Sequence, residues 1–134
     1  MPENQNHRSG PMRVAIVGSR NFKDLGLIRR CLQCFMQASG ESGAPVELVS
    51  GGARGPDSEA KRFARLNGVP ITVHKADWSK HGMQAGFVRN ADIVADTDLV
   101  MAFWDGSSHG TKDMMDRTLA ARKTLYVFFD SLHG

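Results

Sequence analysis

The chain has 134 residues, which is enough for one domain with a hydrophobic core and too few for two. Hydrophobic residues make up 41% of the sequence, as in ordinary globular proteins. No apolar run is as long as a membrane-spanning helix, which needs about 20 residues. The net charge of +3 comes without a block of five or more basic residues, so an anionic ligand suits the chain but nucleic acid is not favoured. The polar residues 1–10 lack the apolar stretch of a signal peptide, and we expect a cytoplasmic protein.

The N-terminal third predicts a tail, a strand and a helix. We expect residues 1–11 to form a disordered tail. Arg13–Gly18 is a continuous apolar run with β-branched residues, which is typical of a fully buried strand. Asp24 is suited to cap the helix that follows, whose apolar residues recur at helical spacing, and Gly40 and Gly43 are expected to end it.

The middle of the chain repeats this alternation. Val46–Ser50 predicts a second buried strand, and Pro56 suits the first position of a second helix that Gly68 closes. Val69–His74 predicts a third strand. The inward face of the second helix is expected to consist of Ala60, Phe63 and Ala64.

The C-terminal half predicts a loop over Ala76–Met83 and a less periodic third helix over Gln84–Ala95. A fourth helix is expected to start with Thr111 as its cap and to run through Lys123, with Met115 and Leu119 facing inward. The last two strands are expected at Leu99–Trp104 and Thr124–Phe129.

Five strands that alternate with four helices predict parallel βαβ units with right-handed crossovers. The predicted fold class is therefore α/β: a single three-layer Rossmann-like domain, spanning residues 12–134, with a mostly parallel five-stranded sheet. Ligands of such sheets bind beyond the carboxyl ends of the strands, near the point where the strand order switches direction.

Three glycine-marked loops follow predicted strands and precede predicted helices. Glycine allows sharp turns and close approach of a ligand, and a helix N-terminus supplies unpaired N–H groups that suit phosphate. The loops therefore predict a nucleotide pocket. They are Gly18-Ser19-Arg20-Asn21, Ser50-Gly51-Gly52-Ala53-Arg54-Gly55-Pro56-Asp57 and Trp104-Asp105-Gly106-Ser107-Ser108-His109-Gly110-Thr111.

The second loop carries the most specific motif of the three. The backbone N–H groups of the paired glycines, Gly51 and Gly52, can form an anion-binding nest. Arg54 adds a positive charge that can bind phosphate. The alternative is a tight turn that only packs the helix on the strand. Neither a Gly-x-Gly-x-x-Gly fingerprint nor a Walker loop is present.

Other residues have a functional and a structural interpretation each. Trp78 or Trp104 is suited to stack on a base, although core packing explains Trp104 equally well. Arg89 and Asn90 either point toward the pocket or lie on a solvated helix face. The C-x-x-C pair, Cys31 and Cys34, falls inside a predicted helix and is interpreted as two core or near-core thiols, so no metal site is expected.

Taken together, these loops and the Arg89-Asn90 pair resemble the YspA-type branch of the SLOG superfamily over about residues 13–129. This Rossmann-like superfamily includes phosphoribohydrolases of the LOG type and the DNA-processing protein of natural transformation. The resemblance implies a nucleotide or nucleotide-derived ligand, no required cofactor, and a homodimer or higher homo-oligomer. The expected ligand-binding residues are Gly18, Ser19, Arg20, Gly51, Gly52, Ala53, Arg54, Asp57, Trp78, Arg89, Asn90, Asp105, Gly106, Ser107, Ser108, Gly110 and Thr111.

Enzymatic activity stays open at this point. The LOG-type enzymes carry a Pro-Gly-Gly-x-Gly-Thr-x-x-Glu pattern, and Met114 stands where their glutamate falls. Hydrolysis would need Asp113 or Asp116 to act in place of that glutamate. Arg89 is the third catalytic candidate. The leading expectation is a nucleotide sensor or processor. The alternatives are an N-glycosidic hydrolase of a nucleoside monophosphate or NAD-like molecule and a single-stranded nucleic-acid binder.

Overall fold

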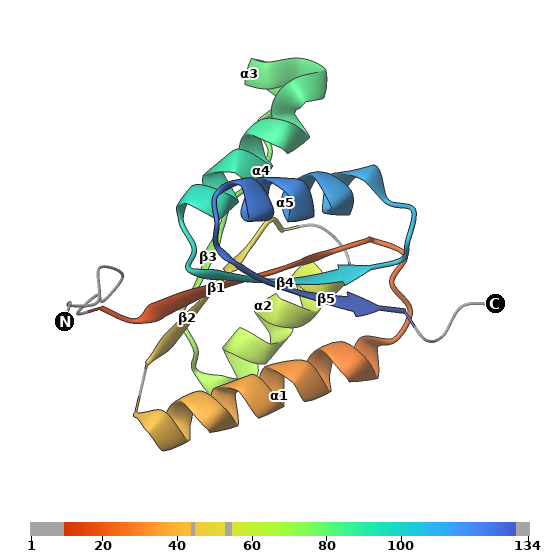
Figure 1. Ribbon diagram of the computed structural model, residues 1–134. Coiled ribbons are helices and arrows are strands. Elements are labelled where there is room, and N and C mark those ends of the chain that lie inside the picture. Colours follow the sequence, from red (N-terminus) through yellow and green to blue (C-terminus); the bar gives the residue numbers. More distant parts are fainter. Residues whose placement is uncertain (1–9, 44, 53–54, 131–134) are drawn as a thin grey trace.

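The computed structural model describes residues 10–43, 45–52 and 55–130, so most of the expected tail and the residues Ala53 and Arg54 lie outside the described part (Figure 1). Strands and helices alternate along the chain. In order they are β1 (Met12–Gly18), α1 (Leu25–Ser42), β2 (Val46–Ser50), α2 (Pro56–Asn67), β3 (Ile71–Val73), α3 (Trp78–His81), the 3₁₀ helix η1 (Gly82–Gln84), α4 (Ala85–Ala95), β4 (Leu99–Trp104), α5 (His109–Ala120) and β5 (Thr124–Phe129).

The strands form one sheet in the order β3-β2-β1-β4-β5, and every neighbouring pair is parallel. The predicted α/β, Rossmann-like fold class is confirmed. After β1 the chain adds strands on one side of the sheet, and it then crosses to add β4 and β5 on the other. The switch point therefore lies between β1 and β4.

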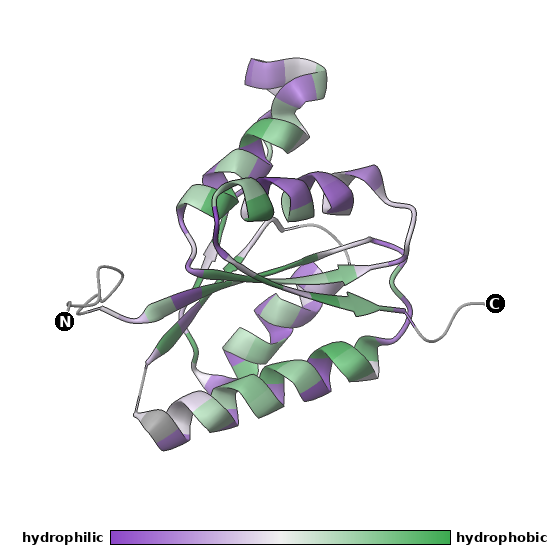
Figure 2. Cartoon of the chain, in the orientation of Figure 1, coloured by the Kyte–Doolittle hydropathy of each residue, from purple (hydrophilic) through white to green (hydrophobic). Residues whose placement is uncertain are grey.

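Helices cover both faces of the sheet, with α1 and α2 below it and α4 and α5 above it in Figure 1. Val14 and Ile16 of β1 pack with Ile28 of α1 in the lower core, while Ala15 and Val17 face Ile93 of α4 in the upper core. All four β1 residues are at most 5% exposed, because a strand between two helical layers buries both of its faces. Figure 2 shows the apolar surfaces of the helices turned toward the sheet.

Helix ends follow the predicted signals in most places. The Asp24 carboxylate accepts from the Leu27 amide at 3.0 Å and caps α1. Pro56 opens α2, and Gly68 closes it in the left-handed conformation that favours glycine. Gly43 ends α1 in the same way, but Gly40 lies inside the helix, so that part of the prediction was wrong.

The expected loop over residues 76–83 is also wrong, because α3 and η1 occupy it. The Asp77 side chain accepts from the Lys80 amide at 3.1 Å and from the Ser79 hydroxyl at 2.9 Å, and this capping starts α3 without any apolar periodicity. The third strand is shorter than Val69–His74, since the Val69 amide still bonds the end of α2.

The fourth predicted helix needs three corrections. Ser108, rather than Thr111, is the N-cap of α5, and the helix ends at Ala120, before Lys123. Leu119 is 60% exposed, whereas Met114 is the apolar residue that α5 buries most fully. On α1, Cys31 packs against the core, and burial raises the pKa of its thiol, but Cys34 is exposed and is no core thiol.

Within the described residues, the structure contains no helix of the length and apolarity that crossing a membrane requires.

Candidate functional site

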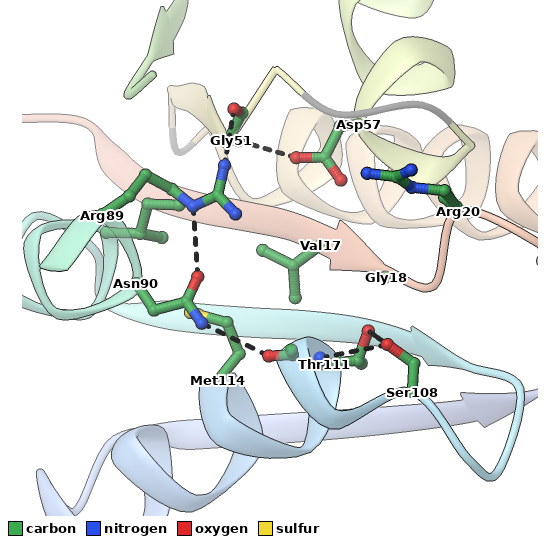
Figure 3. Close-up of a pocket in the computed structure, with 12 residues that line it drawn as sticks. Val17, Gly18, Arg20, Gly51, Asp57, Arg89, Asn90, Ser108, Thr111 and Met114 are labelled. Atoms are coloured by element: carbon green, nitrogen blue, oxygen red, sulfur yellow. Dashed lines mark hydrogen bonds between the residues drawn. The ribbon is translucent and has the colours of Figure 1, made fainter. Parts of the chain in front are cut away.

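A small polar pocket lies at the carboxyl ends of β1 and β2, beside the switch point (Figure 3). Its cavity volume of about 180 Å³ is below the roughly 300–1,000 Å³ of typical small-molecule pockets. The pocket is therefore suited to a part of a nucleotide, such as a phosphate with its sugar. Its lining consists of Val17, Gly18, Arg20, Gly51, Asp57, Arg89, Asn90, Ile93, Ser108, Gly110, Thr111 and Met114.

Gly18 brings the end of β1 into tight contact with its neighbours. A Cβ at this position would lie 2.4 Å from the Phe103 backbone oxygen and 2.5 Å from Cγ of Pro56. Neither neighbour has room to give way, because Phe103 is in β4 and Pro56 starts α2. Glycine at position 18 is therefore a packing requirement that places Arg20 beside the pocket.

The second loop is held by a buried carboxylate. Oδ2 of Asp57, in the first turn of α2, accepts from the Gly51 amide at 2.7 Å and from the Ser50 hydroxyl at 3.2 Å. Asp57 is only 4% exposed, yet it lines the pocket. The bonds fix the end of β2 against the start of α2, and the carboxylate faces the pocket as an acceptor.

Arg89 and Asn90 of α4 connect the loops. Nη1 of Arg89 donates to the Gly51 carbonyl at 2.9 Å, and Nε donates to Oδ1 of Asn90 at 3.2 Å. Nδ2 of Asn90 then donates to Asp113 at 3.0 Å and to the Gly110 carbonyl at 3.3 Å. Both residues line the pocket and do not lie on a solvated helix face (Figure 3).

The opposite end of α4 is anchored to the sheet. The Asp96 carboxylate that follows α4 receives hydrogen bonds from Nη2 of Arg13 and Nε2 of His74, both at 2.8 Å. Partial burial works to raise the pKa of Asp96, but the bonds from Arg13 and His74 outweigh it and the pKa lies below its usual value. This anchor fixes the helix that carries Arg89.

The N-terminus of α5 forms the other wall. Ser108 caps the helix by accepting from the Thr111 amide, and the two hydroxyl oxygens are 3.3 Å apart. Buried Ser19 joins them through a 3.3 Å contact with the Thr111 hydroxyl and accepts from the Asp105 amide at 3.1 Å. A Cβ on Gly110 would meet no atom within 4 Å, so the backbone here is open to a ligand.

The rest of the third loop shapes this wall from behind. The Asp105 carboxylate accepts from the amides of Ser107 and Ser108 at 2.9 and 2.8 Å. These backbone bonds hold the pKa of the Asp105 carboxyl below its usual value. Trp104 donates from its indole to the Ser108 carbonyl at 3.0 Å and packs on Phe129, so it supports the loop.

The residues that bear on catalysis differ in where they lie relative to the pocket. Met114 is 2% exposed and forms an apolar floor with Val17 and Ile93. Asp113 accepts from Arg117 at 2.7 Å as well as from Asn90, and it is absent from the pocket lining. Asp116 pairs with Lys112 on the surface. Of the three candidates, the structure places Arg89 alone at the pocket.

Nine of the seventeen expected ligand-binding residues line the pocket, and Ala53 and Arg54 lie outside the described residues. Ser19 lies behind the wall as a buried bridge, and Gly52, Asp105, Gly106 and Ser107 are outside the lining. Trp78 is 62% exposed on α3 and does not line the pocket. Sequence reasoning did not predict the apolar floor: Val17 and Ile93 signal only a core, and Met114 was noted only for the glutamate that it replaces.

The described residues contain no cluster of three or more His, Cys, Asp or Glu side chains that could hold a metal ion.

The fold and the site define a class: a doubly wound α/β protein with a small polar pocket at its switch point. The sequence profile of the YspA, cpYpsA-related SLOG family matches residues 12–81, and the chain belongs to that family. It is also 39% identical to the Gene 61 protein of Mycobacterium phage D29 over 109 residues, which cover 77% of this chain and 85% of the phage protein. No solved structure matches the chain.

Proposed function

We propose that this protein binds a nucleotide or nucleotide derivative in the pocket and acts as a sensor or processor of that ligand. The observation that carries the proposal is the convergence of Arg20, Arg89 and the open N-terminus of α5 on one small cavity. Membership of the SLOG family supports a nucleotide-related role in general.

The phosphate is proposed to lie at the first turn of α5. The first N–H groups of a helix lack intrahelical partners and carry partial positive charge. Gly110 leaves them accessible, and the hydroxyls of Ser108 and Thr111 stand beside them. Arg20 has no hydrogen bond or ion pair within the described residues, so its guanidinium is available to neutralise the phosphate.

The sugar is proposed to lie between Asp57 and the apolar floor. Ribose hydroxyls can donate to the buried Asp57 carboxylate, while the carbon face of the sugar can rest on Met114 and Val17. The cavity has no room for a base as well, so the base extends outward. Trp78 remains a candidate for stacking, whereas the indole of Trp104 is already used in the loop.

Hydrolysis is proposed to be slow or absent. Met114 cannot transfer a proton or stabilise a cationic sugar, and such help is worth about 10²–10⁴-fold in rate. Asp113 is held by Asn90 and Arg117, away from the cavity lining. Asp57 is the one carboxylate in that lining, and it is the residue on which an N-glycosidic hydrolase activity would have to depend.

We further propose a homodimer formed through the projecting segment of α3, η1 and the start of α4, which stands away from the sheet in Figure 1. Besides Trp78, which is kept for the base, this segment exposes two large apolar side chains: Met83 at 90% and Phe87 at 40%. A self-complementary apolar patch of this kind is typical of a two-fold interface. The same segment leads into Arg89, so dimerisation would stabilise the pocket.

Calorimetry with AMP, ribose 5-phosphate and adenosine tests the proposal. AMP and ribose 5-phosphate are expected to bind, and adenosine is expected to bind at least tenfold more weakly because it lacks the phosphate. Arg20→Ala should weaken AMP binding by about 10- to 150-fold, the equivalent of about 1.5–3 kcal/mol. The matched control is Arg30→Ala on the exposed face of α1, which should bind as the wild type does.

Equal affinity for AMP and adenosine, or an unchanged affinity of Arg20→Ala, would contradict the phosphate assignment. Arg54→Ala is expected to weaken AMP binding as Arg20→Ala does. This expectation for Arg54 rests on the sequence alone. Mass spectrometry of any small molecule that co-purifies with the native protein would identify the natural ligand.

A further inference from the structure

A second hollow lies on the opposite layer of the molecule, between α2 and β3. It has a cavity volume of about 460 Å³. Its base is apolar, formed by Ala64, Val69 and Ile71, and its rim carries Lys61, Arg62 and Arg65. We call this hollow, which Ser58 also lines, the basic groove. No carboxylate belongs to its lining.

The three basic residues of the groove are exposed, and none forms an ion pair within the described part of the chain. They share one face of α2 because positions 58, 61, 62 and 65 follow helical spacing. By contrast, Glu59 on another face of α2 pairs with Arg29 of α1 at 2.9 Å. The groove therefore presents positive charge that the protein itself does not neutralise.

The groove runs beside an open sheet edge. β3 is the terminal strand, and it pairs with β2 alone within the described residues. The Pro70 carbonyl and the His74 amide bond to β2. Because backbone groups alternate in direction along a strand, the N–H and C=O groups of Ile71 and Val73 point outward, away from the sheet. An edge of this kind is a template for another strand.

The spacing of the charges fits such a strand. The axial rise from Lys61 to Arg65 is about 6 Å. Side chains on one face of a strand are spaced about 6.7 Å apart. An extended segment paired with β3 would thus place two successive same-face residues opposite Lys61 and Arg65, and the charge of the groove requires those residues to be acidic.

We propose that the basic groove receives an acidic, extended segment of a partner protein, which adds to the sheet as a further strand beside β3. Backbone hydrogen bonds to Ile71 and Val73 provide the pairing, and carboxylates facing α2 select the segment. This mode of recognition combines main-chain affinity with side-chain specificity. Single-stranded nucleic acid fits less well, because the groove has no aromatic residue on which bases could stack.

The test uses a capped eight-residue peptide that alternates glutamate and threonine, with its lysine–threonine counterpart and an oligothymidylate as comparison ligands. Fluorescence anisotropy with the full chain should show binding of the acidic peptide, and no binding of the basic one. Hydrogen exchange followed by NMR should show slower exchange of the Ile71 and Val73 amides when the acidic peptide is bound.

The variant Lys61→Glu/Arg65→Glu should lose at least tenfold in affinity for the acidic peptide. The control Arg30→Glu/Arg122→Glu makes the same change in net charge at exposed positions outside both the groove and the proposed dimer interface, and should bind as the wild type does. Thermal unfolding of both variants verifies that they fold.

Three results would overturn the proposal. The first is no binding of the acidic peptide. The second is binding without protection of Ile71 and Val73, which would reduce the interaction to charge attraction. The third is an oligothymidylate that binds the groove and displaces the peptide. None of them bears on the nucleotide pocket, which involves other residues.

Discussion

Nη1 of Arg89 lies 2.9 Å from the backbone oxygen of Gly51, and this hydrogen bond joins α4 to the loop that follows β2. A Cβ at position 51 would lie 2.8 Å from the same Nη1. The absence of a side chain at position 51 and the position of the Arg89 guanidinium therefore depend on each other.

The variant Gly51→Ala should affect binding more than folding. The added methyl group mainly meets the end of the flexible Arg89 side chain, which can move away at small cost in stability, and it also lies 3.1 Å from Oδ2 of Asp57, which has to shift by a few tenths of an ångström. Its guanidinium then leaves the pocket, and the affinity for AMP should fall by about tenfold or more, the effect of losing one charge-assisted hydrogen bond. Calorimetry and urea unfolding measure the two effects. Full affinity with Arg89 displaced in a structure of the variant would remove Arg89 from the site.

The variant Gly18→Ala should instead destabilise the fold. Here the methyl group meets the Phe103 backbone oxygen at 2.4 Å, and a strand of the sheet has to shift. Overpacking of this kind costs about 1–3 kcal/mol or more in the free energy of unfolding. Gly40→Ala is the matched control, because it lies in the open on α1 and should gain about 0.5–1 kcal/mol. Urea unfolding that gives the same stability for both variants would contradict this packing argument.

The third loop should open in acid. Because backbone bonds from Ser107 and Ser108 lower the pKa of Asp105, the folded state favours its ionised form. The stability it contributes is fully present above the unfolded-state pKa of about 3.9 and is lost as the pH falls through the lower folded-state pKa. The difference in unfolding free energy between the wild type and Asp105→Ala should therefore shrink below about pH 4. A difference that stays constant down to pH 2 would show that the charge of Asp105 is irrelevant.

The wild-type protein should release adenine from AMP slowly or not at all. The buried Met114 stands where the glutamate of the LOG-type sequence pattern would fall, and Asp113 and Asp116 are held by Arg117 and Lys112. Chromatography of incubated AMP measures the free base. Robust release that Asp57→Asn, Asp113→Asn or Asp116→Asn abolishes would establish the enzyme and identify its acid.

Light scattering should show a species of twice the 14.7 kDa chain mass at micromolar concentration. Met83→Glu/Phe87→Glu places charges on the proposed interface and should give the monomer mass, while Leu66→Glu, at an exposed residue of α2, should remain dimeric. A wild-type protein that is monomeric at this concentration would rule out the dimer.

Sequence alone predicted the order of the elements, because a strand between two helical layers has to be apolar on both faces. The bounds of β2, β4 and β5 agree with those expected. The four-residue helix α3 escaped prediction, since a short exposed helix held by the Asp77 cap has no apolar period. Thr111 carried a capping signature, but Ser108 precedes it and accepts from the amide of Thr111 itself, so the helix begins three residues earlier than expected.

The sequence also determined which residue types were available for the site: three glycine-marked loops with arginine and hydroxyl side chains. Only the tertiary structure decided which of them meet. Parallel pairing brings Gly18 and Gly51 to one edge, α4 adds Arg89, and Trp78 is left on a projecting helix. In the sequence Met114 was noted only as the residue that stands in place of a glutamate, whereas in the structure it forms the floor of the pocket with Val17 and Ile93. The reason is that α5 packs over the switch point, a long-range arrangement that no local pattern encodes.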